Sequence, residues 1–164
     1  MTGLPARFRI PDKRRQKMSD KGLEERALAF IASLTPDDAT GHDRFHAARV
    51  ARTALAIAER EGADRDTVLL AALLHDADDG KFFPDTHDEK RNARAFMTAE
   101  GIDPDRQDLI CRIIGQVSFK GTDSVVPDTP EGRCVQDADR LDAIGAVGIA
   151  RAFAYGGARG RKMY

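Results

Sequence analysis

Apolar residues recur every three or four positions along most of this chain, the spacing that places them on one face of an α-helix. The alternation with a period of two that marks a half-buried strand is nearly absent. The pattern predicts a first helix that carries Leu23 to Leu34 and is capped by Ser19 or Asp20, then helices over about 43–61, 66–77, 105–118 and 143–154, with further helices that begin near residue 86 and at residue 130. We therefore expect an all-α bundle of about six to seven unequal helices.

Local signals place several helix ends. The helix over 43–61 should stop before Gly62, because glycine favours the left-handed backbone that ends many helices. The Asp78-Asp79-Gly80 sequence breaks the third helix, and Pro130 suits the first turn of the sixth. The residues expected to point inward include Val50, Ala54 and Ile57 on the second helix, Ala93, Phe96 and Met97 on the fourth, and Val135, Ala138 and Leu141 on the sixth.

The composition is that of a folded domain. Of the 164 residues, 41% are hydrophobic and 32% are charged, and the formal net charge of −1 gives no overall attraction to nucleic acid or to an anionic membrane. We expect a flexible basic arm over residues 1–18, a helical domain over 19–155 and a polar, glycine-rich tail over 156–164. Basic ends of this kind are usually solvated, so a nucleic-acid partner is not expected.

The sequence also bears on the compartment. No segment combines the charged start, apolar centre and cleavage site of a signal peptide, and the apolar runs are too short to cross a bilayer. Cys111 and Cys134 lie among apolar neighbours, which favours reduced core thiols over a disulfide. We therefore expect a cytoplasmic protein without a membrane partner, and the oligomeric state is left open, a homodimer included.

The candidate chemistry lies at the end of the most apolar stretch of the chain. His75 and Asp76 follow this stretch directly, and burying an imidazole or a carboxylate costs free energy unless the group is paired or ligated. His46 precedes Val50 by one turn and so falls on the inward face of its helix. The acidic run over 137–142 supplies further oxygens. Two nitrogens and two oxygens suit a divalent transition metal ion.

Three segments carry a specific resemblance. They are Gly41-His-Asp-Arg-Phe-His46-Ala-Ala-Arg-Val50, Ala71-Ala-Leu-Leu-His75-Asp76 and Val135-Gln-Asp-Ala-Asp139-Arg-Leu-Asp142-Ala143. From about residue 20 onward the chain resembles the HD superfamily of metal-dependent phosphohydrolases, and within it a small bacterial single-domain branch that includes nucleotide pyrophosphohydrolases. The resemblance implies an HD-domain-like helical bundle with His46, His75, Asp76 and Asp139 as metal ligands.

The resemblance also bears on the metal. Asp137 is the weaker candidate for the fourth ligand, since two residues of separation turn it about 200° around the helix from Asp139. Members with two metals carry extra histidines on intervening helices, whereas residues 113–118 have none here and His87 alone is spare. We therefore expect one divalent ion. The donors suit Mn²⁺, Fe²⁺, Co²⁺ or Ni²⁺, with Mg²⁺ as a further option.

Asp79 is the expected catalytic residue that positions or deprotonates the attacking water. It follows His75 by four residues, the spacing at which related hydrolases place an acidic catalytic residue. Its nearest rival is Asp78, and the alternative is a carboxylate that only ends the helix. His42 would contact phosphate or protonate the leaving group, or else cap the helix start together with Asp43.

Cations are needed to bind phosphate groups. Lys81, just after the His-Asp pair, is the candidate clamp. Arg49 and Lys120 are further candidates, either for binding phosphate or for supporting the metal ligands, although each is more often a surface charge. The aromatic candidates for stacking on a base are Phe45, Phe82, Phe83, Phe119 and the region of Tyr155.

The resemblance implies a small phosphorylated substrate, with a nucleotide in first place. The favoured reaction converts a nucleoside triphosphate to a monophosphate and pyrophosphate through a metal-activated water. A phosphate monoesterase that acts on nucleoside monophosphates is the second interpretation. The third, of another class, is a binding or signalling module that keeps the metal without turnover, which a closed tetrahedral site would favour. Similar proteins continue past 156–164 into further helices, which implies that this chain lacks a wall of the pocket or an oligomer contact.

Overall fold

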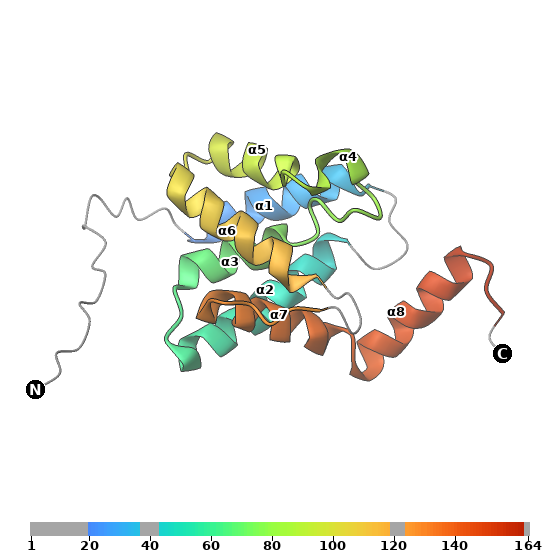
Figure 1. Cartoon of the computed structure of the whole chain (residues 1–164). Coiled ribbons are helices and arrows are strands. Elements are labelled where there is room, and N and C mark those ends of the chain that lie inside the picture. The colour runs from blue at the N-terminus through green and yellow to red at the C-terminus, as the bar shows by residue number, and fades with distance from the viewer. Residues whose placement is uncertain (1–19, 37–42, 119–123, 163–164) are drawn as a thin grey trace, which may run out of the picture.

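The computed structural model describes residues 20–36, 43–118 and 124–162, and every regular element in these ranges is a helix (Figure 1). The eight helices there are α1 (Asp20–Leu34), α2 (Arg44–Glu61), α3 (Arg65–Leu74), α4 (Pro84–His87), α5 (Arg91–Ala99), α6 (Pro104–Val117), α7 (Pro130–Asp142) and α8 (Gly145–Ala158). The predicted all-α fold is confirmed. The expected arm over 1–18 lies outside the described residues, as do His42, Phe119 and Lys120.

Helix α3 forms the centre of the fold. Every residue from Thr67 to Leu74 is buried, and α1, α2, α6 and α7 pack around this run (Figure 1). Burying each leucine side chain stabilises the fold by roughly 1.5–3 kcal/mol. The most apolar stretch of the sequence therefore anchors the bundle, and it holds His75 and Asp76 at its end in a fixed place.

Helix α2 is fixed at both ends, as the sequence predicted. At its start the Asp43 carboxylate accepts hydrogen bonds from the backbone N–H groups of Phe45 and His46, at 3.0 and 2.9 Å. At its end Gly62 adopts a left-handed backbone with φ of 68° and donates its N–H to the carbonyl of Ala58. The cap at Asp43 places His46 in the first helical turn, where its side chain is buried.

The chain after α3 differs from the prediction in two ways. The helix ends at Leu74 rather than near residue 77, and the expected fourth helix is divided into α4 and α5. The division falls at Lys90, whose φ of 53° is left-handed. The Asp78 carboxylate accepts hydrogen bonds from the N–H groups of Asn92 and Ala93, at 3.0 and 2.9 Å. A new helix starts at this point because its orphan N–H groups find an acceptor there.

Helix α8 also differs from the prediction. It runs to Ala158 and so enters the segment expected to be a tail, and none of its residues is buried. Figure 1 shows it leaving the end of α7 and projecting away from the bundle. Leu141, expected to point inward, is 49% exposed because α8 does not cover it. Four apolar residues near it or along α8 are exposed too, namely Ile144, Val147, Ile149 and Phe153.

Among the described residues, no helix combines the length and apolar character needed for a membrane span.

Candidate metal centre

Four side chains from three helices converge on one point. His46 comes from the first turn of α2, His75 and Asp76 from the end of α3, and Asp139 from the last turn of α7. The Nε2 atoms of the two histidines lie 3.2 Å apart. The Asp76 Oδ2 atom lies 3.5 Å from Nε2 of His46 and 3.4 Å from Nε2 of His75. The Asp139 Oδ1 atom lies 3.4 and 3.6 Å from the same two nitrogens. The structure thus brings together the four predicted ligands, whose role as ligands stays a prediction.

The ligand atoms of His46, His75 and Asp76 all lie within 4.8 Å of one another, a spacing that could hold a single divalent ion, and Asp139 lies beside the two histidines of this group. With a distance of about 2.1 Å from metal to ligand, adjacent ligand atoms lie about 3.0 Å apart in an octahedral site and about 3.4 Å apart in a tetrahedral one. The separations between the two imidazole nitrogens, and from these nitrogens to the carboxylate oxygens of Asp76 and Asp139, are 3.2–3.6 Å and are close to these values. The side chains of His46 and His75 are buried, whereas those of Asp76 and Asp139 are 21% and 24% exposed. The carboxylate side of the cluster is therefore the side open to solvent.

Both imidazoles are oriented through their other ring nitrogen. The Nδ1 atom of His75 lies 2.8 Å from the backbone carbonyl oxygen of Ala72, which can only accept a hydrogen bond. The Nδ1 atom of His46 lies 2.8 Å from Oδ2 of Asp142. In both rings the tautomer that this geometry favours carries its proton on Nδ1 and leaves the Nε2 lone pair facing the cluster.

Two arginines surround the Asp142 carboxylate. Arg49 donates from Nε to Oδ1 at 2.7 Å and from Nη2 to Oδ2 at 2.9 Å, and Arg151 of α8 donates from Nη1 to Oδ2 at 2.9 Å. The sequence left open whether Arg49 binds phosphate or supports the site. Its two bonds to Asp142 favour support.

The charges of the cluster perturb one another strongly. Burial by itself would lower the pKa of His75, but the Asp76 charge and the contact with Asp139 raise this pKa to about 10. Burial would raise the pKa of Asp139, but hydrogen bonds and charge interactions with His46 and His75 hold it well below its usual range. The metal-free site is therefore suited to holding positive charge, which a divalent cation also supplies.

The neighbouring aspartates have separate environments. Asp78, the rival candidate for the catalytic base, is buried, and its carboxylate caps α5. Asp79 is half-buried, and its Oδ1 accepts a hydrogen bond from the backbone N–H of Lys81 at 2.8 Å. The Lys81 side chain is exposed. The role of Lys81 as a phosphate clamp and that of Asp79 as the base stay predictions. His87 Nδ1 lies 2.8 Å from the backbone oxygen of Asp78, so this histidine holds the loop after α3.

Sequence reasoning missed the roles of two residues at this site. The sequence identified Asp142 only as a member of the acidic run over 137–142 and predicted no role for Arg151. One signal was available for Asp142, since it follows Asp139 by three residues and therefore shares its helix face. Asp137 shows the opposite case, because its side chain is exposed on another face of α7.

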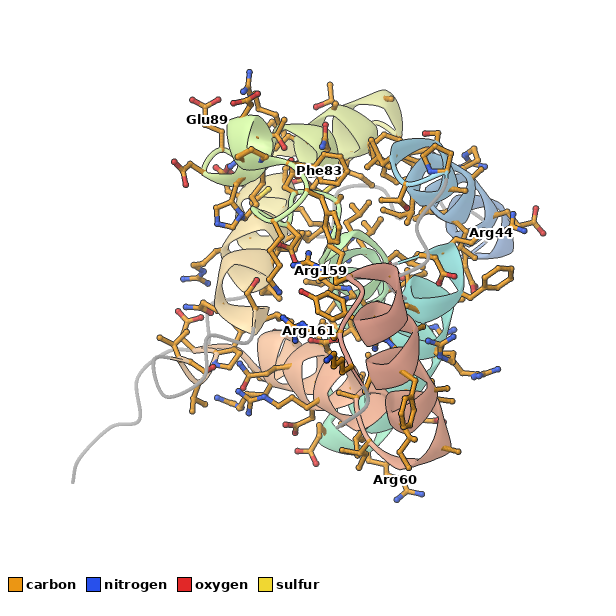
Figure 2. All side chains as sticks on the ribbon, turned by 90° about the vertical axis from the view of Figure 1, so that its right-hand side faces the viewer. Arg44, Arg60, Phe83, Glu89, Arg159 and Arg161 are labelled. Atoms are coloured by element: carbon orange, nitrogen blue, oxygen red, sulfur yellow. The ribbon has the colours of Figure 1, made fainter. Side chains whose placement is uncertain are left out.

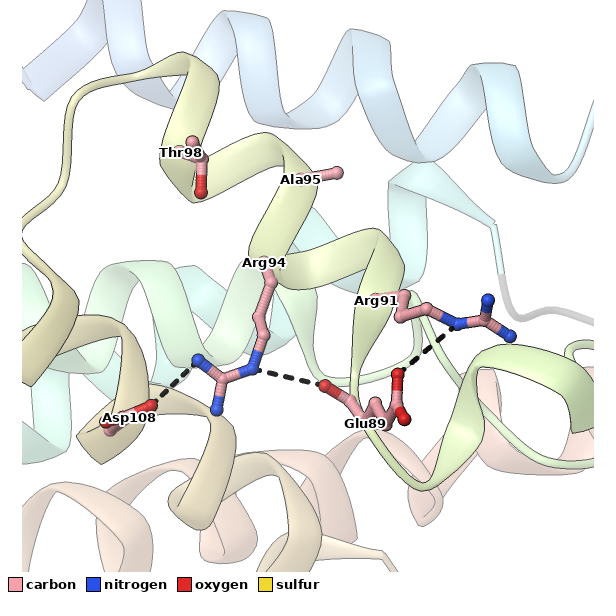
Figure 3. A pocket seen from close by; sticks show the side chains of 6 residues that line it. All are labelled: Glu89, Arg91, Arg94, Ala95, Thr98 and Asp108. Atoms are coloured by element: carbon pink, nitrogen blue, oxygen red, sulfur yellow. Dashed lines mark hydrogen bonds and ion pairs between the residues drawn. The ribbon is translucent and has the colours of Figure 1, made fainter.

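A separate cavity of about 850 Å³ lies over α5 and α6 (Figure 3). Its charged lining residues are paired with one another, Arg94 with Asp108 at 2.7 Å and Arg91 with Glu89 at 3.8 Å. It contains none of the cluster residues, and its paired charges make it a poor candidate for the reaction site.

Comparison with known families and proteins agrees with this geometry. The HD domain family matches residues 45–144 of the chain, a span that contains all four cluster residues. The YpgQ protein of Bacillus subtilis (strain 168) is 42% identical over 153 residues, which make up 90% of this chain and 73% of YpgQ.

Several solved protein structures are also similar to this chain in fold and in sequence. The crystal structure of B. subtilis YpgQ in complex with ADP is similar with a TM-score of 0.69 and 41% identity, covering 86% of this chain and 71% of that one. An HD-superfamily hydrolase from Bacillus thuringiensis is similar with a TM-score of 0.67 and 36% identity, covering 89% and 71%. A predicted HD-superfamily hydrolase from an uncultured Thermotogales bacterium has a TM-score of 0.62 at 32% identity, covering 80% and 74%.

Proposed function

Because this chain belongs to the HD domain family of metal-dependent phosphohydrolases, we propose that it hydrolyses nucleotides, converting a nucleoside triphosphate to a monophosphate and pyrophosphate. The observation that carries the proposal is the convergence of His46, His75, Asp76 and Asp139 at one solvent-reaching point. A relative of known structure binds ADP, which supports a nucleotide over other phosphate esters.

The proposed ligands for one divalent ion are His46, His75, Asp76 and Asp139. Such an ion, when bound, polarises a phosphate group and lowers the pKa of water toward neutrality. The chain's own residues then orient the reactants. The two buried imidazoles close one side of the site, and the partly exposed carboxylates leave the other side accessible to a phosphate and a water.

Asp79 is the proposed general base. The hydrogen bond from the Lys81 N–H engages its Oδ1, and the contacts of this loop with His87 and with Asn92 hold it in place. A carboxylate in this position would take the proton of the attacking water as the P–O bond to the pyrophosphate leaving group breaks. Lys81 is the proposed cation for the departing phosphates.

A cavity beside α8 supports recognition of a nucleotide. It has a volume of about 570 Å³, within the usual range for small-molecule sites, and its lining includes Phe153, Tyr155 and Arg161. The guanidinium carbon of Arg159 lies 4.4 Å from the centre of the Tyr155 ring, and that of Arg161 lies 5.5 Å from it (both arginines are labelled in Figure 2). Tyr155 follows Arg151 by four residues, so it lies one turn further along the face of α8 that carries Arg151.

The test is product release from nucleoside tri-, di- and monophosphates with added Mn²⁺, with pyrophosphate and phosphate measured separately. Pyrophosphate from triphosphates is the expected result. Phosphate from monophosphates would replace the proposal with a monoesterase. No release from any of them, by a folded protein shown to hold Mn²⁺, would overturn the nucleotide hydrolase and favour a binding module.

The Asp79→Asn variant tests the proposed base in the same assay. We expect its turnover to fall by about 10²–10⁴-fold, the usual contribution of general base catalysis, with Mn²⁺ binding retained. Glu59→Gln is the matched control, because it removes a carboxylate from an exposed position on α2. Unchanged turnover in Asp79→Asn would remove Asp79 from the mechanism.

A further inference from the structure

We propose that Asp142 is a positioning residue of the metal centre, which accepts the Nδ1 proton of His46 and so keeps the Nε2 lone pair directed at the ion. Arg49 and Arg151 hold this carboxylate in place from two other helices. The inference rests on the metal site of the proposed function, but not on the identity of the substrate.

The contacts at Nδ1 of His46 determine which ring nitrogen carries the proton. Two groups lie near its Nδ1 atom, the Asp142 carboxylate at 2.8 Å and Nη1 of Arg151 at 3.2 Å. A carboxylate only accepts a hydrogen bond and a guanidinium only donates one, so the two contacts favour opposite tautomers. The shorter contact is the one to the carboxylate. The alternative tautomer would carry its proton on Nε2, where it would point at His75 and exclude the ion.

The Asp142 carboxylate is itself held in one orientation. Asp142 has a side chain only 8% exposed, and burying an unpaired charge there would be costly. Its two oxygens accept four hydrogen bonds, two from Arg49 and one each from Arg151 and His46. The paired bonds from Arg49 fix the plane of the carboxylate, which fixes the direction from which Oδ2 meets the imidazole.

The two histidines are oriented by different kinds of group. His75 is oriented by the backbone carbonyl of Ala72, which belongs to the buried run of α3. His46 is oriented by a side chain, the carboxylate of Asp142. Asp142 is therefore the point at which a substitution can alter the direction of a ligand without removing the ligand.

The arrangement also connects α8 to the metal centre. None of the residues of α8 is buried, yet Arg151 reaches into the cluster and contacts both Asp142 and His46. Asp142 thus joins α2, α7 and α8 at the same carboxylate.

The test measures binding of Mn²⁺ alone, by titration calorimetry on the full chain after metal removal. Replacing a group that orients a ligating histidine typically lowers metal affinity 10–100-fold. We expect such a loss for Asp142→Asn, with helical circular dichroism unchanged, and no loss for the control Glu59→Gln. Equal affinity in a folded Asp142→Asn variant would overturn the role of Asp142. Absence of Mn²⁺ binding by the unaltered chain would overturn the metal site itself.

A second measurement needs no substitution and so does not depend on the stability of a variant. Long-range ¹⁵N–¹H spectra of the histidine-labelled, Zn²⁺-loaded chain report which ring nitrogen carries the proton. We expect His46 to carry it on Nδ1 with Nε2 ligated. A proton on Nε2, or ligation through Nδ1, would overturn the proposal whatever the outcome of the nucleotide assay.

Discussion

His46 and His75 direct their Nε2 atoms at each other across 3.2 Å, although they are 29 residues apart in the chain. Two neutral imidazoles with lone pairs facing at this distance repel each other unless a proton or a cation lies between them. Burial of both rings makes that requirement stronger, because little water is available to separate them. A cation between the two rings would explain why the bundle buries two histidines whose Nε2 atoms face each other.

The proposed role of Asp139 of α7 as the fourth metal ligand can be tested by substitution. Asp139→Asn should weaken Mn²⁺ binding by at least 10-fold, because Asp139 lies 3.4 Å from Nε2 of His46 and supplies a negative charge. Asp137→Asn should leave the affinity unchanged, since its side chain is exposed outside the cluster. Titration calorimetry of the two variants side by side checks the assignment, and the reverse order of effects would transfer the role to Asp137.

Substitution of the two aspartates after α3 should affect different properties, stability for Asp78 and turnover for Asp79. Asp78→Ala leaves the N–H groups of Asn92 and Ala93 without their acceptor, and we expect it to lower the free energy of unfolding by about 1–3 kcal/mol. Asp79→Asn should lower turnover while stability holds. Urea unfolding and product release, measured on both variants, separate the effects. A stable but inactive Asp78→Ala protein would indicate that the base was assigned to the wrong residue.

The stability of the metal-free protein should fall as the pH rises from about 6.5 to 10. The pKa of His75 is raised from 6.5 to about 10 in the folded state, so its stabilising contribution is complete below about 6.5 and is lost as the pH approaches 10. Mn²⁺ should reverse the trend, since ligation requires neutral imidazoles and its stabilisation grows with pH. Thermal unfolding from pH 6 to 9, with and without Mn²⁺, measures both slopes. Parallel slopes would contradict the assignment of His75 as a ligand.

Below that range the carboxylates control stability. The pKa of Asp142 lies well below its usual value because its hydrogen bonds to His46 and Arg49 outweigh the effect of burial, and their contribution is present above about pH 4. It should be lost as the pH falls further. The Asp142→Asn variant should therefore show a weaker decline in melting temperature below pH 4 than the unaltered chain. An identical acid profile would show that the carboxylate is not held as described.

The cavity beside α8 should affect substrate binding more than chemistry. Tyr155→Ala removes the ring against which Arg159 and Arg161 lie, and we expect KM for a nucleotide to rise by about 5–150-fold, on the basis of about 1–3 kcal/mol per stacked base. The turnover number should change much less. Steady-state kinetics on this variant separate the two constants, and a loss confined to turnover would place Tyr155 outside the binding site.

Much of the fold follows from local signals in the sequence. The caps at Asp43 and Gly62, the proline at the start of α7 and the apolar run before His75 all act within a few residues, so their effects were predictable. The break at Lys90 was not, because the acceptor that starts α5 is Asp78, twelve residues earlier in the chain. The exposure of Leu141 likewise depends on where α8 lies.

In the candidate site, too, some features follow from local sequence signals and others depend on how distant helices pack. The four converging residues could be identified from their types, their helical spacing and a family resemblance. The bonds of Asp142 could not, since they join Arg49 and Arg151 across three helices that the sequence does not place relative to one another. The same holds for the assignment of Asp78 to a structural contact, which requires knowing that α5 begins beside it.

The most direct test of the account is a metal titration of activity. The chain is stripped of metal, Mn²⁺ is added back in steps at a protein concentration far above the dissociation constant, and pyrophosphate released from a nucleoside triphosphate is measured. We predict no release without metal and a rate that saturates at one equivalent of Mn²⁺. Full release from the metal-free chain, or a rate that requires two equivalents, would contradict a single-ion centre built from His46, His75, Asp76 and Asp139.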